Sequence, residues 1–243
     1  MAELPVMIIQ HLEWEGPGEH LRAGLAEFGI SWRTVEVWRQ PLPPLCRCRG
    51  LIVLGGSPNV DEEERFPYLV PLKALIRECL TARVPCLGFC LGHQLLGQVL
   101  GCPVVPLPRK SIGYREGELT PAGRAHPAFQ GLPPRFPLFK WHGQGVVQPL
   151  PPEVEIVATS PEVPVEALSV TGQPWVLGLQ FDNHAGAGDL TRWLAADQEW
   201  ALADSGVDPE VLLTAARRRD PEVGQWFRRF LGNFCRLAGW LAP

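Results

Sequence analysis

The segment from Val84 to Gly101, VPCLGFCLGHQLLGQVLG, constrains the fold more than any other part of the sequence. It begins with a short apolar run typical of a buried strand, and the leucines and valine that follow Cys90 recur at helical spacing. Gly88 and Gly92 lie two residues before and after Cys90, where a strand, a tight turn and a helix must approach closely. We therefore predict a strand that turns sharply at Cys90 into a helix ended by Gly101.

The predicted turn gives Cys90 an unusual environment. Its side chain would project from the turn at a helix N-terminus, where unpaired amide groups and the helix dipole favour thiolate over thiol. A lone cysteine between a strand and a helix is more often buried and inert. Two glycines and Gln94 in register with it make that alternative less attractive here. Cys90 is therefore the candidate nucleophile.

Residues 88–94, GFCLGHQ, resemble the G-x-C-x-G-x-Q signature of class I glutamine amidotransferases, whose cysteine attacks the side-chain amide of glutamine. The resemblance extends from the strand PVMIIQH and the EGPG loop to about Trp193. It implies an α/β fold, a flavodoxin-like three-layer α/β/α sandwich with a mostly parallel sheet and a small antiparallel extension. We expect one domain over residues 1–243, with C-terminal helices at about 187–243 packed on it.

Composition and charge exclude several classes of protein. The 243 residues are 46% hydrophobic, which is ample for one large α/β domain. The balance of 22 basic against 26 acidic residues includes no basic block that could follow a phosphate backbone, so nucleic acid is not an expected partner. No apolar run approaches the roughly 20 residues needed to cross a bilayer, and no secretory signal is visible. Seven cysteines without paired spacing favour a reduced, cytoplasmic protein.

The remaining elements follow a β-α-β opening and then a series of short strands. The predicted strands are Pro5–Gln10, Trp32–Trp38, Leu51–Leu54, Val104–Pro106, Ser111–Leu119, Arg135–Trp141, Val154–Ser160, Val165–Val170 and Trp175–Phe181. The predicted helices, besides the one after Cys90, are Glu19–Phe28, Leu69–Ala82, Leu190–Ala203, Pro209–Arg219 and Glu222–Leu241. The later strands are expected to form the antiparallel extension beside the parallel core.

Two glycines directly follow the strand Leu51–Leu54, in the sequence Gly55-Gly56-Ser57-Pro58. Glycines at the end of a strand let backbone amides face a ligand without obstruction, although a tight turn is the commoner meaning of such a tetrapeptide. The family carries a Gly-Gly loop at this point. The resemblance implies that the amides of Gly56 and Leu91 form an oxyanion hole, with Gly55 beside the substrate.

The segment Trp141-His142-Gly143 resembles one found beside the glutamine pocket in stand-alone proteins that look like the glutaminase half of GMP synthetase. An isolated histidine after a strand is more often structural, so we assign Trp141, His142 and Gly143 to substrate binding and not to chemistry. Gln94 is expected to contact the amino-acid end of the substrate. Three other histidines are expected to be solvated: His11, His20 and His126.

The strand Gly178–Phe181, GLQF, matches the one that leads into the family's catalytic His-x-Glu, but here the next residues are Asp182-Asn183-His184. In the family the histidine takes the thiol proton and the carboxylate orients the imidazole. An aspartate, with an ordinary pKa of about 3.9, is a poor base near neutral pH. Its negative charge would also raise the pKa of Cys90.

Three functions remain open. A bulge or register shift could bring His184 to Cys90 with Asp182 as its partner, since the two side chains point the same way on an extended backbone. Cys90 would then form a γ-glutamyl thioester that water hydrolyses, and ammonia would pass to a synthase or acceptor enzyme in trans. A γ-glutamyl peptidase would use the same thioester. Otherwise the chain is a catalytically inactive ligand-binding or regulatory homologue.

In each case the expected ligand is glutamine or a γ-glutamyl small molecule. The sequence carries no P-loop or other nucleotide-binding signature, and its cysteines lack the spacing of a zinc site. We therefore expect neither a cofactor nor a metal ion.

Overall fold

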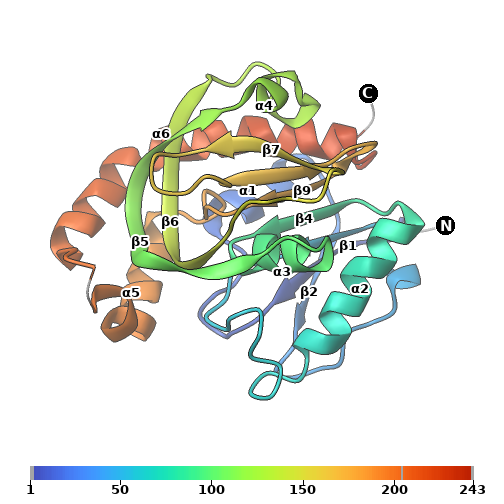
Figure 1. Cartoon of the computed structure of the whole chain (residues 1–243), viewed down its shortest axis with the longest axis horizontal. Coiled ribbons are helices and arrows are strands. Elements are labelled where there is room, and N and C mark those ends of the chain that lie inside the picture. The colour runs from blue at the N-terminus through green and yellow to red at the C-terminus, as the bar shows by residue number, and fades with distance from the viewer. Residues whose placement is uncertain (1–2, 204, 242–243) are drawn as a thin grey trace.

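A computed structural model describes residues 3–203 and 205–241, and Figure 1 shows its architecture. Within these residues one mixed sheet has the strand order β2-β1-β3-β4-β9-β8-β7-β5-β6. The strands are β1 Val6–Gln10, β2 Trp32–Glu36, β3 Gly50–Val53, β4 Cys86–Phe89, β5 Val104–Leu119, β6 Arg135–Val146, β7 Val154–Thr159, β8 Ala167–Val170 and β9 Gln173–Leu179. The helices are α1 Glu19–Glu27, α2 Leu69–Ala82, α3 Leu91–Val99, α4 Pro121–Ala125, α5 Ala187–Leu202 and α6 Pro209–Leu237.

The parallel half of the sheet consists of β2, β1, β3, β4 and β9. Strand β1 is buried along its whole length, and its alternate residues enter different cores. Ile8 packs in a core with residues of α1 and α6, whereas Ile9 packs in a core with residues of α2 and α3. A strand buried on both faces requires helices on both sides of the sheet. This arrangement confirms the predicted flavodoxin-like three-layer fold.

The antiparallel half of the sheet is larger than the small extension we predicted. Four pairings in the described part of the chain are antiparallel and four are parallel. The predicted strands Val104–Pro106 and Ser111–Leu119 belong to one long strand, β5, whose register with β6 shifts between Pro106 and Ser111. The prolines in this segment hid the continuity, because proline cannot donate to a ladder and is tolerated at such irregular points.

The C-terminal helices also differ from the prediction. Helix α6 runs continuously from Pro209 to Leu237, through Pro221, where we expected two helices. Proline removes one backbone hydrogen bond and strains the preceding turn. Buried side chains lie on both sides of this point, including Leu212 and Phe227, so packing holds the helix together. Helix α5 contains a non-helical residue, Asp197, with φ −135° and ψ 21°.

The three histidines predicted to be solvated have protein partners instead. His11 and His126 are buried, with Nδ1 of His11 3.1 Å from the Tyr68 hydroxyl and Nε2 of His126 3.0 Å from the Ser169 hydroxyl. His20 is largely buried and contacts Asp220 at 3.3 Å. The prediction was wrong because a polar side chain can be buried wherever the fold supplies a hydrogen-bond partner.

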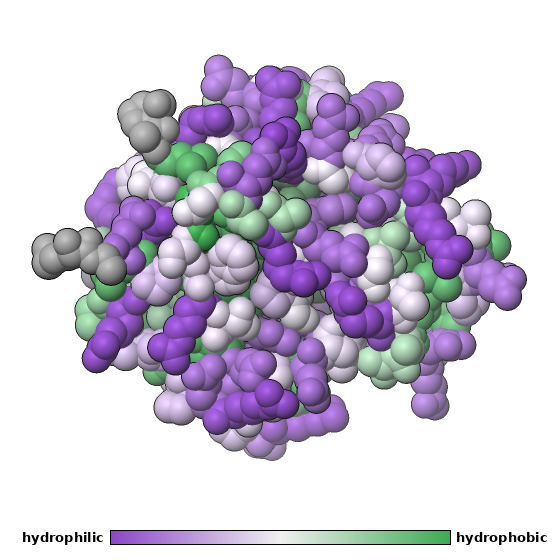
Figure 2. Space-filling model, turned by 180° about the vertical axis from the view of Figure 1, so that it is seen from behind, coloured by the Kyte–Doolittle hydropathy of each residue, from purple (hydrophilic) through white to green (hydrophobic). Residues whose placement is uncertain are grey.

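The surface opposite the viewer of Figure 1 is shown in Figure 2, where hydrophilic side chains cover most of the face and smaller hydrophobic areas lie between them. None of the described helices combines the length and the apolar character needed to cross a membrane. The long helix α6 illustrates why, since its buried aromatic residues occupy one face and its arginines the other.

Candidate functional site

Cys90 occupies a sharp turn between β4 and α3, as predicted. Its φ of 46° and ψ of −103° place a residue with a side chain in a strained region of backbone space. Both flanking glycines are required, because the backbone of another residue lies where a side chain would begin. A Cβ on Gly88 would lie 2.5 Å from the carbonyl of Gly92, and a Cβ on Gly92 would lie 2.2 Å from the carbonyl oxygen of Val53. The sequence around Cys90 is therefore fixed by the geometry of the turn.

A cavity of about 250 Å³ opens beside Cys90. It lies at the carboxyl ends of the parallel strands, where open α/β sheets place their ligands. The residues of the predicted site that line it are Gly55, Gly56, Cys90, Gln94, Trp141, His142, Gly143, Asp182 and His184. The side chain of Leu91 packs against the glycine loop, since a Cβ added to Gly56 would be 3.0 Å from Cδ2 of Leu91. The fold therefore gathers the predicted residues around one cavity.

The glycine loop after β3 packs tightly against the turn. A Cβ on Gly55 would lie 3.3 Å from Cβ of Cys90, and a Cβ on Gly56 would lie 2.8 Å from Cβ of His11. The amide of Leu91 faces the thiol of Cys90 and lowers its pKa by hydrogen bonding. The Leu91 amide and the loop at Gly55 therefore border the sulfur atom.

Asp182 is one of two buried carboxyl side chains whose charge acts on Cys90. Its own amide donates a 2.8 Å hydrogen bond to the carbonyl of Phe139, which fixes the backbone, and its side chain is buried. A Cβ on Gly55 would lie 3.2 Å from Oδ1 of Asp182 and 4.0 Å from Sγ of Cys90. Burial raises the pKa of Cys90 well above its ordinary value, and the charges of Asp182 and Glu15 raise it further. The cysteine is therefore held as a thiol.

His184 lies against the carboxylate of Asp182, with Nε2 3.3 Å from Oδ1. The contact is not aligned as a hydrogen bond, and neither ring nitrogen of His184 has a hydrogen-bond partner among the described residues. The ring packs 4.6 Å from the ring of Phe89, and the carbonyl oxygen accepts a 3.1 Å hydrogen bond from Leu21 at the start of α1. No imidazole nitrogen of His184 is bonded to the sulfur atom of Cys90.

Glu15 is a buried carboxylate of the cavity that the sequence analysis missed. Its Oε2 accepts a 3.1 Å hydrogen bond from the amide of Ser57 and its Oε1 a 3.2 Å bond from the hydroxyl of the same residue. Burial raises the pKa of Glu15 to about 8, and the charges of Asp197 and Asp182 contribute to this shift. A signal was available, because Glu15 belongs to the loop at the carboxyl end of β1.

Asp197 adds a third carboxylate to the cavity, from the kink in α5. Its Oδ2 accepts a 3.4 Å hydrogen bond from Nε1 of Trp141, and burial raises its pKa. No signal in the sequence marked this aspartate, because an acidic residue in an amphipathic helix is ordinarily solvated. Two further tryptophans on the same helix, Trp193 and Trp200, also line the cavity.

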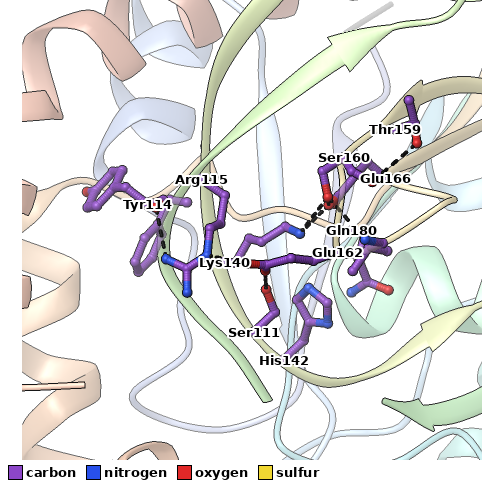
Figure 3. A network of polar contacts seen from close by, with 12 residues as sticks. Ser111, Tyr114, Arg115, Lys140, His142, Thr159, Ser160, Glu162, Glu166 and Gln180 are labelled. Carbon is purple, nitrogen blue, oxygen red and sulfur yellow. Dashed lines mark hydrogen bonds and ion pairs between the residues drawn. The ribbon is translucent and has the colours of Figure 1, made fainter. Parts of the chain in front are cut away.

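A buried polar network supports the strand that carries His142, and Figure 3 shows its members. Lys140 and Glu166 are fully buried and form an ion pair, and Nζ of Lys140 also donates a 3.2 Å hydrogen bond to the hydroxyl of Ser160. At the outer side of the network Glu162 accepts a 2.9 Å hydrogen bond from Nε of Arg115. The network anchors β6 to the segment before β8.

His142 is held as a neutral ring. Burial and the neighbouring charge of Lys140 lower its pKa to about 3. Its Nδ1 lies 2.9 Å from the carbonyl oxygen of Gln144, which can only accept, so Nδ1 carries the proton and Nε2 is an acceptor. Gln94 donates from the same amide nitrogen to the carbonyl of Gln144 at 2.9 Å and to the side chain of Gln180 at 3.2 Å. The amide nitrogen of Gln94 is therefore committed to protein partners.

The side chains around the cavity do not form a metal centre. Over residues 3–203 and 205–241, no group of three or more histidine, cysteine, aspartate or glutamate side chains is arranged to hold a metal ion. What the cavity offers instead is a buried thiol, several carboxylates, a neutral imidazole and indole rings.

The sequence matches the family described as "Glutamine amidotransferase class-I" over residues 19–182, a match that ends before His184. The glutamine amidotransferase-like protein YfeJ of Salmonella typhimurium is 34% identical over 142 residues, covering 56% of this chain and 59% of that protein. The glutamine-hydrolyzing GMP synthase of Thermomicrobium roseum is 35% identical over 164 residues, covering 67% of this chain and 27% of that protein. The match thus spans less than two thirds of each relative's length.

Solved structures share the fold over nearly the whole chain. A glutamine amidotransferase from Thermotoga maritima superposes with a TM-score of 0.85 at 28% identity, covering 98% of this chain and 99% of that chain. A glutamine amidotransferase from Methylobacillus flagellatus superposes with a TM-score of 0.85 at 26% identity, covering 97% and 96%. The structural likeness therefore includes the helices beyond residue 182 as well as the region that the family match covers.

Proposed function

The chain belongs to the class-I glutamine amidotransferase family, and from this premise we propose that its cavity binds glutamine or a γ-glutamyl compound without forming a thioester on Cys90. The observation that carries the proposal is the position of Asp182, a buried carboxylate beside the cysteine. The protein is then a ligand-binding or regulatory homologue of the glutaminase domains.

The proton balance of thioester formation supports this proposal. The cysteine must lose a proton before it attacks an amide, and the departing amine must gain one. Cys90 is a buried thiol whose neighbours Asp182 and Glu15 oppose a second negative charge. Its sulfur atom lies 3.8 Å from the carbonyl oxygen of Trp141, which can accept a hydrogen bond from the thiol but cannot take its proton. The surroundings of Cys90 therefore favour the unreactive form.

The residues that we assign to ligand binding border the cavity, whereas in the described part of the chain the hydrogen-bond partner of the Cys90 sulfur is a backbone carbonyl and not a base. The glycine loop and the Leu91 amide border the sulfur, and Trp141 and His142 line the same cavity. A ligand held there would carry a signal to a synthase or acceptor enzyme acting in trans, and would not supply that enzyme with ammonia. All seven cysteines lie in the described part of the chain and are free thiols, in keeping with a cytoplasmic location.

One observation favours a second candidate, a cysteine hydrolase with a relocated base. Nε2 of His184 lies 3.3 Å from Oδ1 of Asp182, so the carboxylate already connects the imidazole to the neighbourhood of Cys90. A shift of this loop would allow a γ-glutamyl thioester on Cys90, hydrolysed by water to glutamate. The substrate would be glutamine, with ammonia passing to an enzyme in trans, or a γ-glutamyl peptide.

Intact-mass measurement after exposure to an electrophilic diazoketone analogue of glutamine separates the two candidates. We expect wild-type protein to bind L-glutamine or a γ-glutamyl dipeptide in calorimetry but to remain unlabelled by the analogue. Cys90→Ser serves as the blank for labelling. Labelling of wild type at Cys90 that disappears in His184→Ala would overturn the proposal and establish the relocated base.

A further inference from the structure

The cavity beside Cys90 is lined by three carboxyl groups and by buried hydrogen-bond acceptors that have no partner among the described residues. We propose that its ligand has a cationic amine in addition to the α-amino group of an amino acid, as in a γ-glutamyl amide that ends in an aliphatic ammonium. This inference rests on the proposed function, because it specifies the ligand of the same cavity. Three carboxylates from separate parts of the chain carry it: Glu15 after β1, Asp182 after β9, and Asp197 in α5.

These carboxyl groups are only partly compensated, because His184 lies 3.3 Å from Asp182 and the charge of Lys110 lowers the pKa of Asp197 less than burial raises it. All three line the same cavity, and the charges of Asp182 and Asp197 contribute to the raised pKa of Glu15. Oδ1 of Asp182 has no hydrogen-bond partner among the described residues, although the residue is only 1% exposed. Arg65 is the sole arginine or lysine among the described lining residues, and its side chain is 75% exposed at the rim, beside Glu62 at 3.6 Å. Burial raises the pKa of all three carboxyl groups, so an ammonium group on the ligand would stabilise their charged forms.

The acceptor on His142 is an independent indication of the same ligand chemistry. Its proton resides on Nδ1, so the buried Nε2 presents a lone pair, and within the described part of the chain this atom has no partner. Oε1 of Gln144, another lining residue, is likewise buried and unpartnered there. Leaving such atoms unpaired is costly. A ligand rich in N–H groups satisfies them, whereas a second carboxylate would not.

The walls of the cavity also suit an organic cation. Trp141, Trp193 and Trp200 line it, and indole faces attract ammonium groups. Trp200 already does so at the rim, where Nζ of Lys110 lies 4.7 Å from the ring centroid. A volume of about 250 Å³ accommodates an amino acid with a short extension. The side chains show no arrangement for a metal ion in residues 3–203 and 205–241, so we assign the cation to an amine of the ligand.

Free glutamine fits this charge pattern less well than an amine conjugate does. Its α-amino group brings one positive charge, but its α-carboxylate brings a negative charge into a cavity that already has three carboxylates. An additional ammonium at the far end of the ligand makes the molecule a net cation. Replacing that ammonium by a methyl group keeps the shape of the ligand and removes the attraction, which isolates the contribution of charge.

Calorimetry with two matched probes at pH 8 tests the inference. The probes are γ-L-glutamyl-ethylenediamine, which ends in an ammonium, and γ-L-glutamyl-n-propylamine, which ends in a methyl group. We expect the full chain to bind the ammonium probe at least about tenfold more tightly. Glu15→Gln and Asp197→Asn should each reduce this preference about threefold or more, because each replaces a carboxyl that an ammonium can ionise by a neutral amide that keeps an oxygen for Ser57 or Trp141. Glu155→Gln, an exposed carboxylate on β7, should leave it unchanged.

The outcomes separate this inference from the proposed function. Equal affinity for the two probes, or a preference for the methyl probe, would overturn the inference and leave a γ-glutamyl pocket. If neither probe nor L-glutamine binds, both proposals are wrong. Mass spectrometry of the recovered probes decides the remaining question. Hydrolysis through Cys90 would contradict the proposed function, while the ratio of affinities would still decide the inference.

Discussion

Asp182 and Cys90 converge on the same glycine: a Cβ added to Gly55 would lie 3.2 Å from Oδ1 of the aspartate and 3.3 Å from Cβ of the cysteine. Both residues thus border the glycine loop, and the charge of Asp182 raises the pKa of Cys90. Burial makes this arrangement costly for a thiolate, because a second negative charge would have to form in a site of low dielectric.

The ionisation of Cys90 gives the first prediction. We expect Cys90 to be alkylated with an apparent pKa above the free-cysteine value of about 8.5, and Asp182→Asn to lower this pKa because it removes the opposing charge. Site-resolved mass spectrometry across pH 6 to 11 measures both, with the exposed Cys46 as an internal reference. A pKa for Cys90 below that of Cys46 would show that a cation stabilises the thiolate.

The raised pKa of Glu15 gives a stability prediction with a definite sign. The native protein keeps this carboxyl protonated up to about pH 8, whereas in the unfolded chain it ionises near 4.5. Its contribution to stability is therefore complete at low pH and is lost as the pH rises toward 8. Glu15→Gln cannot ionise, so its unfolding free energy relative to wild type should rise by up to about 1.4 kcal/mol per pH unit between pH 5 and pH 8.

Urea unfolding at pH 5, 6.5 and 8 measures this effect. Glu155→Gln is the matched control, because it removes an exposed carboxylate and should show no such trend. If the unfolding free energies of wild type and Glu15→Gln change equally with pH, the carboxyl of Glu15 ionises normally in the native protein, and water reaches it.

The buried Lys140–Glu166 pair gives a prediction about folding. Lys140→Met leaves Glu166 buried without its partner and should destabilise the protein by about 3–5 kcal/mol. Arg115→Met breaks the half-exposed pair with Glu162 and should cost no more than about 1 kcal/mol. Denaturant unfolding compares the two variants directly. Similar losses would indicate that water reaches Glu166 and screens its charge.

Much of the fold could be predicted because the informative signals are local. The turn at Cys90 depends on glycines two residues away, and the buried strand β1 is apolar along nearly its whole length. The continuity of helix α6 could not be predicted, since Pro221 is a local signal for a helix end and the packing of Phe227 and its neighbours keeps the helix continuous. Local patterns could not reveal that dependence on tertiary contacts.

The candidate site, like the fold, could be predicted where its residues belong to local motifs. Apart from Leu91, the predicted site residues from Gly55 to His184 line one cavity, and their roles stay predictions. Asp197 had no signal, because its position arises from a kink in α5 that the sequence does not mark. Whether Asp182 or His184 faces the cysteine depends on the path of the backbone over these three residues. That path is fixed by hydrogen bonds to Phe139 and Leu21, which are distant in the sequence.

The most direct measurement is thioester trapping in wild type and in the double variant Asp182→His/His184→Glu, which restores the family's order of base and carboxylate. Both proteins are incubated with L-glutamine, acid-quenched and weighed intact, while released glutamate is quantified. The account predicts no thioester in wild type and glutamate release at least about 100-fold faster in the double variant, abolished by Cys90→Ser. A Cys90 thioester and glutamate release in wild type, lost when the order is restored, would contradict it.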